Sequence, residues 1–267
     1  MQEGTEIFRS TALSTGLSGK GNPRVLIVPH AAYDHIGSLI ASAFSTLVEG
    51  GGAGDVRRVL LLSTLHRDKT GHAILPPYSS FEIPGGSLEV DSAVTEKLKR
   101  DSSVFTVEEV PFTEEHAQEL QLPFILRTFP QARIVPVLLG NNSPGLARRT
   151  AESLLEVMDF SSPETLTLVS TNLSRFVHQE TAFRESEEFI AALEAAPDKV
   201  LRHICDLGEK TACGSGAVLT AVLCFNEALR FLPLMIRSSG PVHPEHREVW
   251  YGSFCGYHES TSQEVVI

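Results

Sequence analysis

Three residues of the chain have side chains that bind transition metals, and each is expected where a loop begins. His30 follows the apolar run Val25–Val28, and His66 follows the run Val56–Ser63. Cys213 lies in ACGSGAV, at the expected N-terminus of an apolar helix, where the helix dipole favours a thiolate. Imidazole and thiolate together suit iron, copper or zinc far better than magnesium or calcium. Taken singly, a histidine at a strand end is usually a loop residue, and a lone cysteine is more often a packing residue than a ligand.

Further polar side chains are expected at the same edge of the fold. In open α/β sheets, ligands gather beyond the carboxyl ends of the strands. Asn172 and Arg175 follow the apolar run Thr165–Ser170. His116 and Glu119 lie three residues apart, so they share one face of a predicted helix. These four residues are candidates for ligand contact, although Arg175 could simply pair with a surface acid.

Two more acids stand just before His116, in the stretch EEHAQE. Glu114 and Glu115 are interpreted as first-turn residues that complement the dipole of the predicted helix. On that interpretation they stabilise the helix and take no part in the candidate site.

Strand and helix patterns alternate along the chain, and they must position these groups. Most strand runs are continuously apolar, which is typical of strands buried on both faces. The sequence therefore predicts an α/β fold: a single domain, residues 1–267, with a central mixed or largely parallel sheet flanked by helices on both faces. Strands are expected at Val25–Val28, Val56–Ser63, Ala132–Gly140, Thr165–Ser170 and in LPLMIRSS and VWYGSFCGY. Helices are expected at Ser38–Val48, Asp91–Lys99, Glu114–Arg127, Ser143–Met158, Glu185–Glu194, Pro197–Leu207 and Cys213–Phe231.

Composition and charge exclude several classes of protein. The 267 residues are 42% hydrophobic and 21% charged, as in an ordinary globular protein. A net charge of −11 argues against a nucleic-acid partner, because a phosphate backbone would be repelled. Apolar runs such as VLLL are far shorter than the roughly 20 residues of a membrane span, and the N-terminus lacks a signal-peptide pattern. We therefore expect a cytoplasmic protein whose four cysteines, none in a CxxC pair, are reduced thiols.

The order of the motifs resembles that of the Memo family, also described as system protein B of the AmmeMemoRadiSam set. IVPHAAY, LLSTLHR, FEIPGGSLEVD, EEHAQELQLPF, IVPVLLG and ACGSGAVLTAVL look like that family's segments and run in its order from about residue 24 to the end. The family's N-terminal segment is not visible in residues 1–22. The resemblance implies a fold related to the LigB-type (class III) extradiol dioxygenases, which are non-haem iron enzymes.

The resemblance also implies a metal pocket. In the Memo family two histidines and one cysteine bind iron or copper, and His30, His66 and Cys213 stand at the matching positions. We therefore expect these three residues to bind a divalent transition metal, with Fe(II) or copper favoured, zinc possible, and no cofactor as the remaining alternative. Tyr33, which ends the PHAAY motif, joins the candidates for ligand contact.

The chain departs from the family where acid/base chemistry is expected. The family's SSDFCHW carries an aspartate and a histidine, and here these positions are Asn172 and Arg175. Arg67 replaces the second histidine of the family's SHH motif. An arginine does not act as a general base near neutral pH, because its pKa exceeds about 12. No catalytic base is therefore assigned, and His116 is the one candidate.

Three functions remain open at this stage. The first is a metal-binding protein with a redox or metal-handling role and no intact acid/base histidine. The second is a catalytically silent module that binds a peptide or small anionic ligand in signalling, because Arg67 and Arg175 could bind a carboxylate or phosphate. The third is an active extradiol-type dioxygenase. Oligomer formation is compatible with all three.

Overall fold

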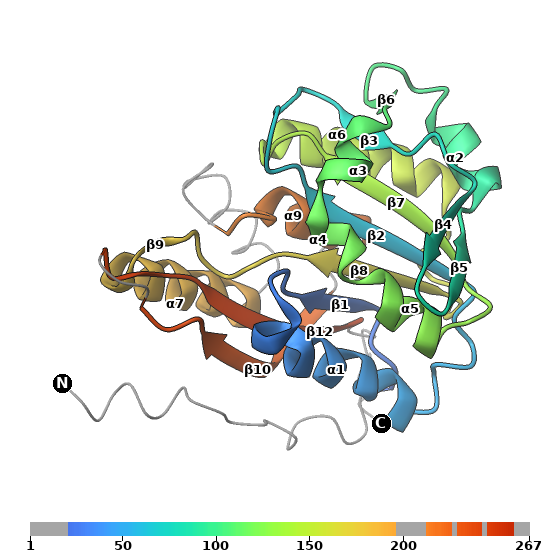
Figure 1. The fold of residues 1–267 in the computed structure, drawn as a ribbon. Coiled ribbons are helices and arrows are strands. Elements are labelled where there is room, and N and C mark those ends of the chain that lie inside the picture. Colours follow the sequence, from blue (N-terminus) through green and yellow to red (C-terminus); the bar gives the residue numbers. More distant parts are fainter. Residues whose placement is uncertain (1–20, 196–211, 226–228, 242–244, 259–267) are drawn as a thin grey trace, which may run out of the picture.

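An eight-stranded mixed sheet forms the centre of the computed structural model of this protein (Figure 1). The residues that the structure describes are 21–195, 212–225, 229–241 and 245–258. In spatial order the strands are β10 (Leu229–Ser238), β12 (Trp250–His258), β1 (Val25–Val28), β8 (Thr165–Ser170), β2 (Arg58–Thr64), β7 (Arg133–Leu139), β3 (Ala73–Leu75) and β6 (Phe105–Val107). The four strands from β1 to β7 are parallel neighbours, and the pairs β10–β12, β12–β1 and β3–β7 are antiparallel. The predicted α/β class with a mixed sheet is confirmed.

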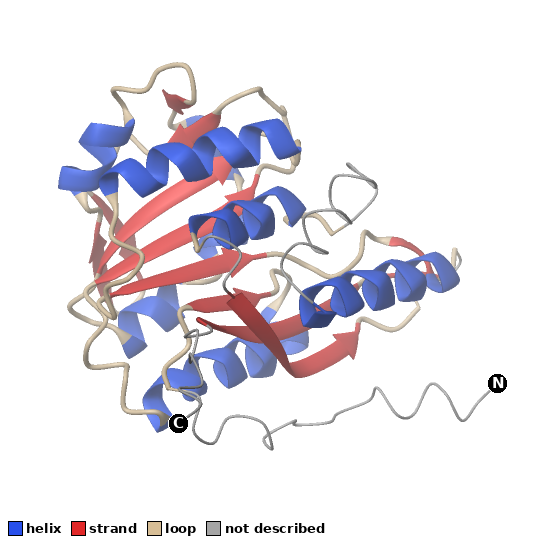
Figure 2. Ribbon diagram, turned by 180° about the vertical axis from the view of Figure 1, so that it is seen from behind, coloured by secondary structure: helices blue, strands red, loops and turns tan. Residues whose placement is uncertain are grey.

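Helices cover both faces of the sheet, as Figure 2 shows from behind. On one face, α1 (Tyr33–Glu49) and α5 (Leu122–Thr128) pack into one hydrophobic core. The other face carries a second core with α2 (Ser92–Leu98), α6 (Pro144–Val157), α7 (Gln179–Ala195) and α9 (Ser215–Cys224). The short helices α3 (Val110–Glu114) and α4 (His116–Glu119) lead into α5. This two-faced burial explains why the central strands carry mostly apolar side chains on both faces.

The first strand shows this pattern residue by residue. Val25 and Ile27 face the core under α6 and α9, whereas Leu26 and Val28 face the core under α1. All four side chains are fully buried, because successive residues of a strand point to opposite faces. A polar substitution at any of the four would bury an unpaired group.

Two small sheets were not predicted from the sequence. They are β4 (Ser80–Ile83) with β5 (Gly86–Glu89), and β9 (Val177–His178) with β11 (Arg247–Glu248). The short strands β3 and β6 were also missed. Segments of two to four residues carry too few side chains to show a period of two in the sequence.

The predicted helix Glu114–Arg127 is wrong as one element, because the chain forms α3, α4 and α5 there. Glu115 has an extended backbone, with φ −93° and ψ 116°, and this conformation ends α3. Pro123 lies in the first turn of α5, where its missing N–H is tolerated but a preceding helical turn is not. The break leaves the side chain of Glu115 free to turn towards the sheet.

The predicted helix Cys213–Phe231 is also wrong in its second half. Helix α9 ends at Cys224, and strand β10 begins at Leu229. A continuous apolar run does not distinguish a buried helix from a buried strand, and this run contains both. The N-terminal prediction is close, since Cys213 precedes the first residue of α9 by two positions.

The remaining helices and the cysteines agree with the sequence predictions in part. Helices α2 and α6 stand where expected, with Asp91 and Ser143 as their N-caps. Helices α1 and α7 are also present, but they begin at Tyr33 and Gln179, before the predicted starts at Ser38 and Glu185. The predicted helix Pro197–Leu207 and Cys205 lie outside the described residues. Cys213, Cys224 and Cys255 are thiols rather than halves of a disulfide. Within the described ranges, no helix is both long and apolar enough to cross a membrane.

Candidate metal centre

The sheet order brings the candidate ligands together. Strands β1, β8 and β2 are adjacent and parallel, so their carboxyl ends meet at one edge of the sheet. His30 follows the end of β1 by two residues, and Asn172 and His66 follow the ends of β8 and β2 at the same offset. Residues that lie 36 and 106 positions apart thus become neighbours, because a parallel sheet aligns the ends of its strands.

The third candidate ligand arrives from the helical layer. Cys213 lies just before α9, and the amide of Asn142 holds the segment that leads from it into this helix. Asn142 Nδ2 donates to the carbonyl of Cys213 over 2.8 Å, and the N–H of Gly216 donates to Asn142 Oδ1 over 2.9 Å. Gly214 passes so close to the end of β8 that a β-carbon there would lie 2.6 Å from Thr171 Cβ. A glycine is therefore required next to the cysteine.

The donor atoms of His30, His66 and Cys213 all lie within 4.8 Å of one another. Cys213 Sγ is 3.3 Å from His30 Nε2. A thiolate about 2.3 Å and an imidazole nitrogen about 2.0 Å from one tetrahedral ion would be roughly 3.5 Å apart. The residues present therefore fit a transition metal, both by donor chemistry and by spacing.

The hydrogen bonds of His30 decide which of its nitrogens faces the sulfur. Ser170 Oγ donates its single proton to the carbonyl of Ala117 over 2.7 Å, and it accepts from Gln121 Nε2 over 3.2 Å. The bond of 2.9 Å between Ser170 Oγ and His30 Nδ1 must therefore be donated by the histidine. His30 thus carries a proton on Nδ1, which leaves Nε2, the nitrogen that faces Cys213 Sγ, available to a metal.

His66 is oriented in the same way by a carboxylate. Its Nδ1 lies 3.0 Å from both oxygens of Glu115, and its backbone N–H donates to Glu115 Oε2 over 2.9 Å. Because the carboxylate can only accept, Nδ1 carries the proton and Nε2 is directed to Cys213. A carboxylate behind a ligating histidine is a common arrangement in metal sites, where it fixes the ring and raises its basicity.

Glu115 was not recognised as part of the site from the sequence. It does cap a helix, since Glu115 Oε1 accepts from the N–H of Ala117 over 3.0 Å at the start of α4. Yet only 6% of its surface is exposed, and its second role is to hold His66. The single signal in the sequence was a pair of acids directly before a candidate histidine, which first-turn acids explain equally well.

Asn172 joins two of the candidate ligands through the backbone. Its Oδ1 accepts from the N–H of His30 over 3.0 Å, and its Nδ2 donates to the carbonyl of the same residue over 3.2 Å. Its own N–H donates to Cys213 Sγ over 3.2 Å. Both ends of the amide are therefore occupied, so Asn172 positions the loop after β1.

Electrostatics favour a charged site. Burial raises the pKa of the Cys213 thiol, but the imidazoles of His30 and His66 outweigh burial and hold this pKa well below its ordinary value. Hydrogen bonds to Cys213 and then to Glu115 raise the pKa of His66 to about 10. Burial raises the pKa of Glu115, yet its bonds to His66 bring it down to about 2. In the metal-free protein, these shifts favour a row of three charged groups: the carboxylate of Glu115, the imidazolium of His66 and the thiolate of Cys213.

Comparison with known proteins identifies the family. A family model described as "Memo-like protein" matches residues 2–254. This chain belongs to the Memo family. A "MEMO1 family protein" of Caldivirga maquilingensis is 28% identical over 198 residues, which are 74% of this chain and 69% of that protein. Proteins of the same description from Saccharolobus solfataricus and Metallosphaera sedula are 28% and 25% identical over 74% and 79% of this chain, and 69% and 74% of their own lengths.

A solved structure extends the comparison to the fold alone. An uncharacterized protein of Escherichia coli K12 superimposes with a TM-score of 0.52 and 9% identity, covering 86% of this chain and 98% of that one. At this identity the likeness concerns the arrangement of the elements, and it says nothing about the site.

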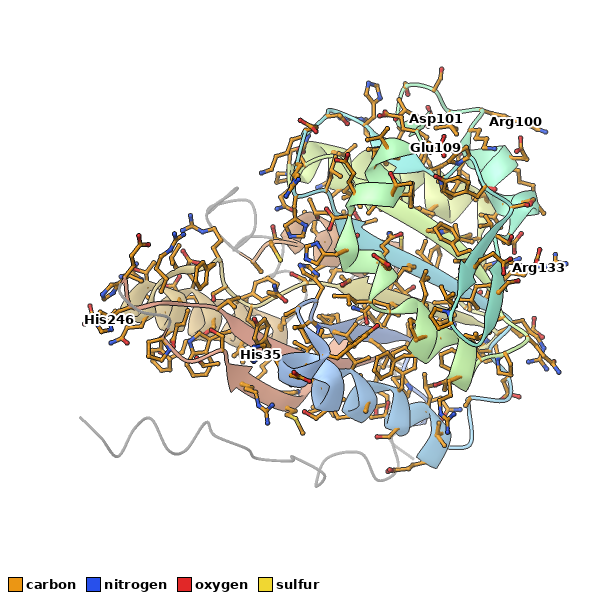
Figure 3. All side chains as sticks on the ribbon, in the orientation of Figure 1. His35, Arg100, Asp101, Glu109, Arg133 and His246 are labelled. Atoms are coloured by element: carbon orange, nitrogen blue, oxygen red, sulfur yellow. The ribbon has the colours of Figure 1, made fainter. Side chains whose placement is uncertain are left out.

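His116 lies beside the three candidate ligands of this Memo-family chain. Its ring centroid is 5.5 Å from that of His30 and 5.3 Å from that of His66. Burial, and then the charge of His30, lower the pKa of His116. By contrast, His35, labelled in Figure 3, lies on α1 and takes no part in the cluster. Its ring stacks against that of Tyr251, with centroids 6.5 Å apart.

The remaining predicted ligand contacts lie around this centre. Tyr33 donates its hydroxyl to the carbonyl of Leu120 over 3.0 Å. Glu119 lines a cavity of about 270 Å³ between the β4–β5 hairpin and α4. Arg67 lines another cavity, of about 190 Å³, next to His66 and His116.

Arg175, which replaces the family's histidine, is engaged elsewhere. Its guanidinium forms an ion pair with Glu185 of α7, and its backbone N–H donates to the same carboxylate over 3.2 Å. Glu185 is 8% exposed, so the pair is half desolvated. Arg175 therefore pairs with an acid, as one of the sequence-based alternatives allowed, but this acid is buried and not at the surface.

Proposed function

We propose that this Memo-family protein binds a transition metal, iron or copper, through His30, His66 and Cys213, and that it handles metal or redox equivalents. The observation that carries the proposal is the orientation of the two imidazoles. Each histidine is fixed by a hydrogen bond at Nδ1, and each directs Nε2 towards one sulfur. Soft and borderline metals favour this donor set. When bound, such an ion would supply Lewis-acid or one-electron chemistry.

The residues around the site favour a metal-handling role over the ring cleavage that an extradiol dioxygenase performs. Arg175 cannot accept a proton near neutral pH, and its charge is neutralised by Glu185. Among the described histidines around the site, His30 and His66 are bonded to Cys213, and His30 is also bonded to Ser170. His116 makes neither of these bonds. The dioxygenase alternative would therefore require His116 as its base.

Metal analysis tests the proposal directly. The purified protein, loaded with Fe(II) or Cu(I) and freed of excess ion, should hold about one equivalent per chain, whereas Cys213→Ala should lose most of it. Cys224→Ala is the matched control, because Cys224 is also a free thiol but lies buried at the far end of α9. Equal, near-zero metal in the wild type and in Cys213→Ala would refute the proposal.

A second candidate function is a binding module for a small anionic molecule or peptide. The observation in its favour is the cavity of about 190 Å³ beside the trio, in which Arg67 takes part. Thermal shift with phosphate, small dicarboxylates and phosphopeptides would measure it, with Arg67→Ala as the variant and Arg57→Ala as the control cation. Stabilisation that persists in Arg67→Ala, or none in the wild type, would count against this function.

A further inference from the structure

We propose that the cavity between the β4–β5 hairpin and helices α3 to α5 (Figure 1) binds a small organic amine that carries a ring or another compact apolar body. The ammonium group would lie among the acidic and amide side chains of the cavity, and the apolar body against its buried hydrophobic residues. The inference goes beyond metal handling and does not depend on a bound metal.

The buried part of the cavity lining is apolar. Leu122 of α5 and Leu138 of β7 are 4% and 0% exposed, and Pro136 of β7 is also buried. Phe81 of the hairpin and Phe112 of α3 are half-buried lining residues. Their ring centroids are 6.1 Å apart, a distance typical of packed aromatic rings. These side chains suit the hydrocarbon part of a ligand.

The volume of the cavity limits the size of the ligand. It is about 270 Å³, slightly below the roughly 300–1,000 Å³ of pockets for drug-sized molecules. A water molecule takes about 30 Å³ in the liquid, so the space corresponds to roughly nine non-hydrogen atoms. A phenyl ring with a two-carbon amine has this size.

The charged side chains of the lining are all acidic among the described residues. Glu82 of β4 and Glu119 of α4 are exposed, whereas Glu115 is buried and already bonded to His66. These carboxylates repel an anion and attract an ammonium ion. The faces of the two phenylalanine rings add to the attraction for a cation. Charge complementarity therefore selects an amine over a carboxylate or phosphate.

A buried acceptor in the wall of the cavity has no partner. Gln118 is 5% exposed and belongs to the lining. Its Nε2 donates to the carbonyls of Leu61 and Val137 over 3.0 and 2.9 Å. Because both carbonyls can only accept, the amide cannot be turned round, and Oε1 is left without a hydrogen bond in the described part of the chain. Buried acceptors are normally satisfied, and an N–H of the amine would supply the missing donor.

This cavity is distinct from the proposed metal centre. Glu115 lines the cavity and holds Nδ1 of His66, while Nε2 of His66 is directed to Cys213. The imidazole ring therefore separates this wall of the cavity from the sulfur. An amine bound in the cavity would not be a ligand of the ion.

Ligand-observed NMR titration of the metal-free protein tests the inference with three molecules of similar shape. 2-Phenylethylamine should bind with one equivalent per chain. 2-Phenylethanol should bind at least about fivefold more weakly, because it lacks the charge that pairs with the carboxylates. Phenylacetate, which carries the opposite charge, should show no measurable binding.

Variants of the lining locate the bound amine. Glu82→Gln and Glu119→Gln should each weaken the amine about two- to fivefold and leave the alcohol unchanged. Thr113→Trp should abolish the binding of both molecules by filling the cavity, and because Thr113 is an exposed lining residue, this change spares the core. Glu114→Gln is the matched control, since Glu114 is an exposed acid that lines the other cavity. Cys213→Ala should bind the amine as the wild type does.

Several results would overturn the inference. They are equal affinity for the amine and the alcohol, no binding of the amine at millimolar concentration, and amine binding that Thr113→Trp leaves unchanged. Amine binding that is lost in Cys213→Ala but kept in Thr113→Trp would assign the amine to the metal centre, and would overturn the inference while leaving the proposed function intact. Conversely, a protein that holds no metal but binds the amine in the expected order would refute the proposed function alone.

Discussion

Replacing Glu115 tests the architecture of the site, because this carboxylate accepts backbone hydrogen bonds and also holds His66, one of the proposed metal ligands. We compare Glu115→Gln and Glu115→Ala with Glu114→Gln, an adjacent exposed acid. Glu115 accepts from His66 Nδ1 and from the backbone N–H groups of His66 and Ala117. Alanine would leave two backbone donors unpaired at about 1–3 kcal/mol each. We therefore expect Glu115→Ala to lose roughly 3 kcal/mol of unfolding free energy and Glu114→Gln almost none.

Metal affinity should respond in the same variants. Losing the acceptor behind a ligating histidine typically weakens metal binding 10–100-fold, as an order-of-magnitude expectation. Competition with a chromogenic chelator would measure the affinity, and urea unfolding of the metal-free protein would measure stability. Glu115→Gln should show the affinity loss with the smaller stability loss, because its amide oxygen still accepts one bond. Unchanged affinity in both variants would refute the role assigned to Glu115 behind His66.

The carboxylate of Glu115 should also make the unfolding free energy fall at acid pH. The folded-state pKa of Glu115 is lowered from 4.5 to about 2, so its contribution is present above about pH 4.5 and is lost as pH falls towards 2. That shift corresponds to on the order of 3 kcal/mol. The stability difference between the metal-free wild type and Glu115→Gln should therefore shrink on acidification from pH 5 to 2. A difference independent of pH over this range would contradict the assigned charge.

Three further perturbations follow from single contacts. Asn172→Asp removes the donor to the carbonyl of His30 and should cost about 1–3 kcal/mol in urea unfolding; an unaltered midpoint would show that the amide does not hold the loop. Arg175→Ala leaves the buried carboxylate of Glu185 without its partner, so stability should fall by about 1–3 kcal/mol while metal content, measured by elemental analysis, stays constant. Gly214→Ala would place a β-carbon 2.8 Å from a backbone oxygen at the end of β8. This overpacking should lower stability by about 1–3 kcal/mol and weaken metal binding. A melting temperature equal to that of the wild type would contradict the close approach.

Much of the fold could be predicted because the central strands have a strong local signal. Val25–Val28 and Thr165–Ser170 are strands β1 and β8 with the expected bounds, since burial on both faces requires apolar or small side chains at successive positions. The same signal failed after Cys213, where helix α9 and strand β10 are equally apolar. It also failed before Leu122, where backbone breaks divide one amphipathic pattern into three short helices.

The candidate site was predictable in part. His30, His66 and Cys213 were singled out by their chemistry, their position at element ends and their resemblance to Memo-family motifs, and the structure brings their donor atoms within 4.8 Å. The supporting residues were not predictable. Ser170 and Glu115 are ordinary as residue types, and their roles depend on which atoms they meet across the sheet.

The sequence by itself determined which residues could bind a metal and which elements end beside them, because side-chain chemistry and apolar runs are local properties. Only the tertiary structure decided which nitrogen of each histidine faces Cys213, since that choice depends on the hydrogen bonds that His30 donates to Ser170 and His66 donates to Glu115. It also placed the ring of His116 beside those of His30 and His66, at centroid distances of 5.5 and 5.3 Å. Such relations join residues far apart in the chain, and they arise when parallel strands align their ends.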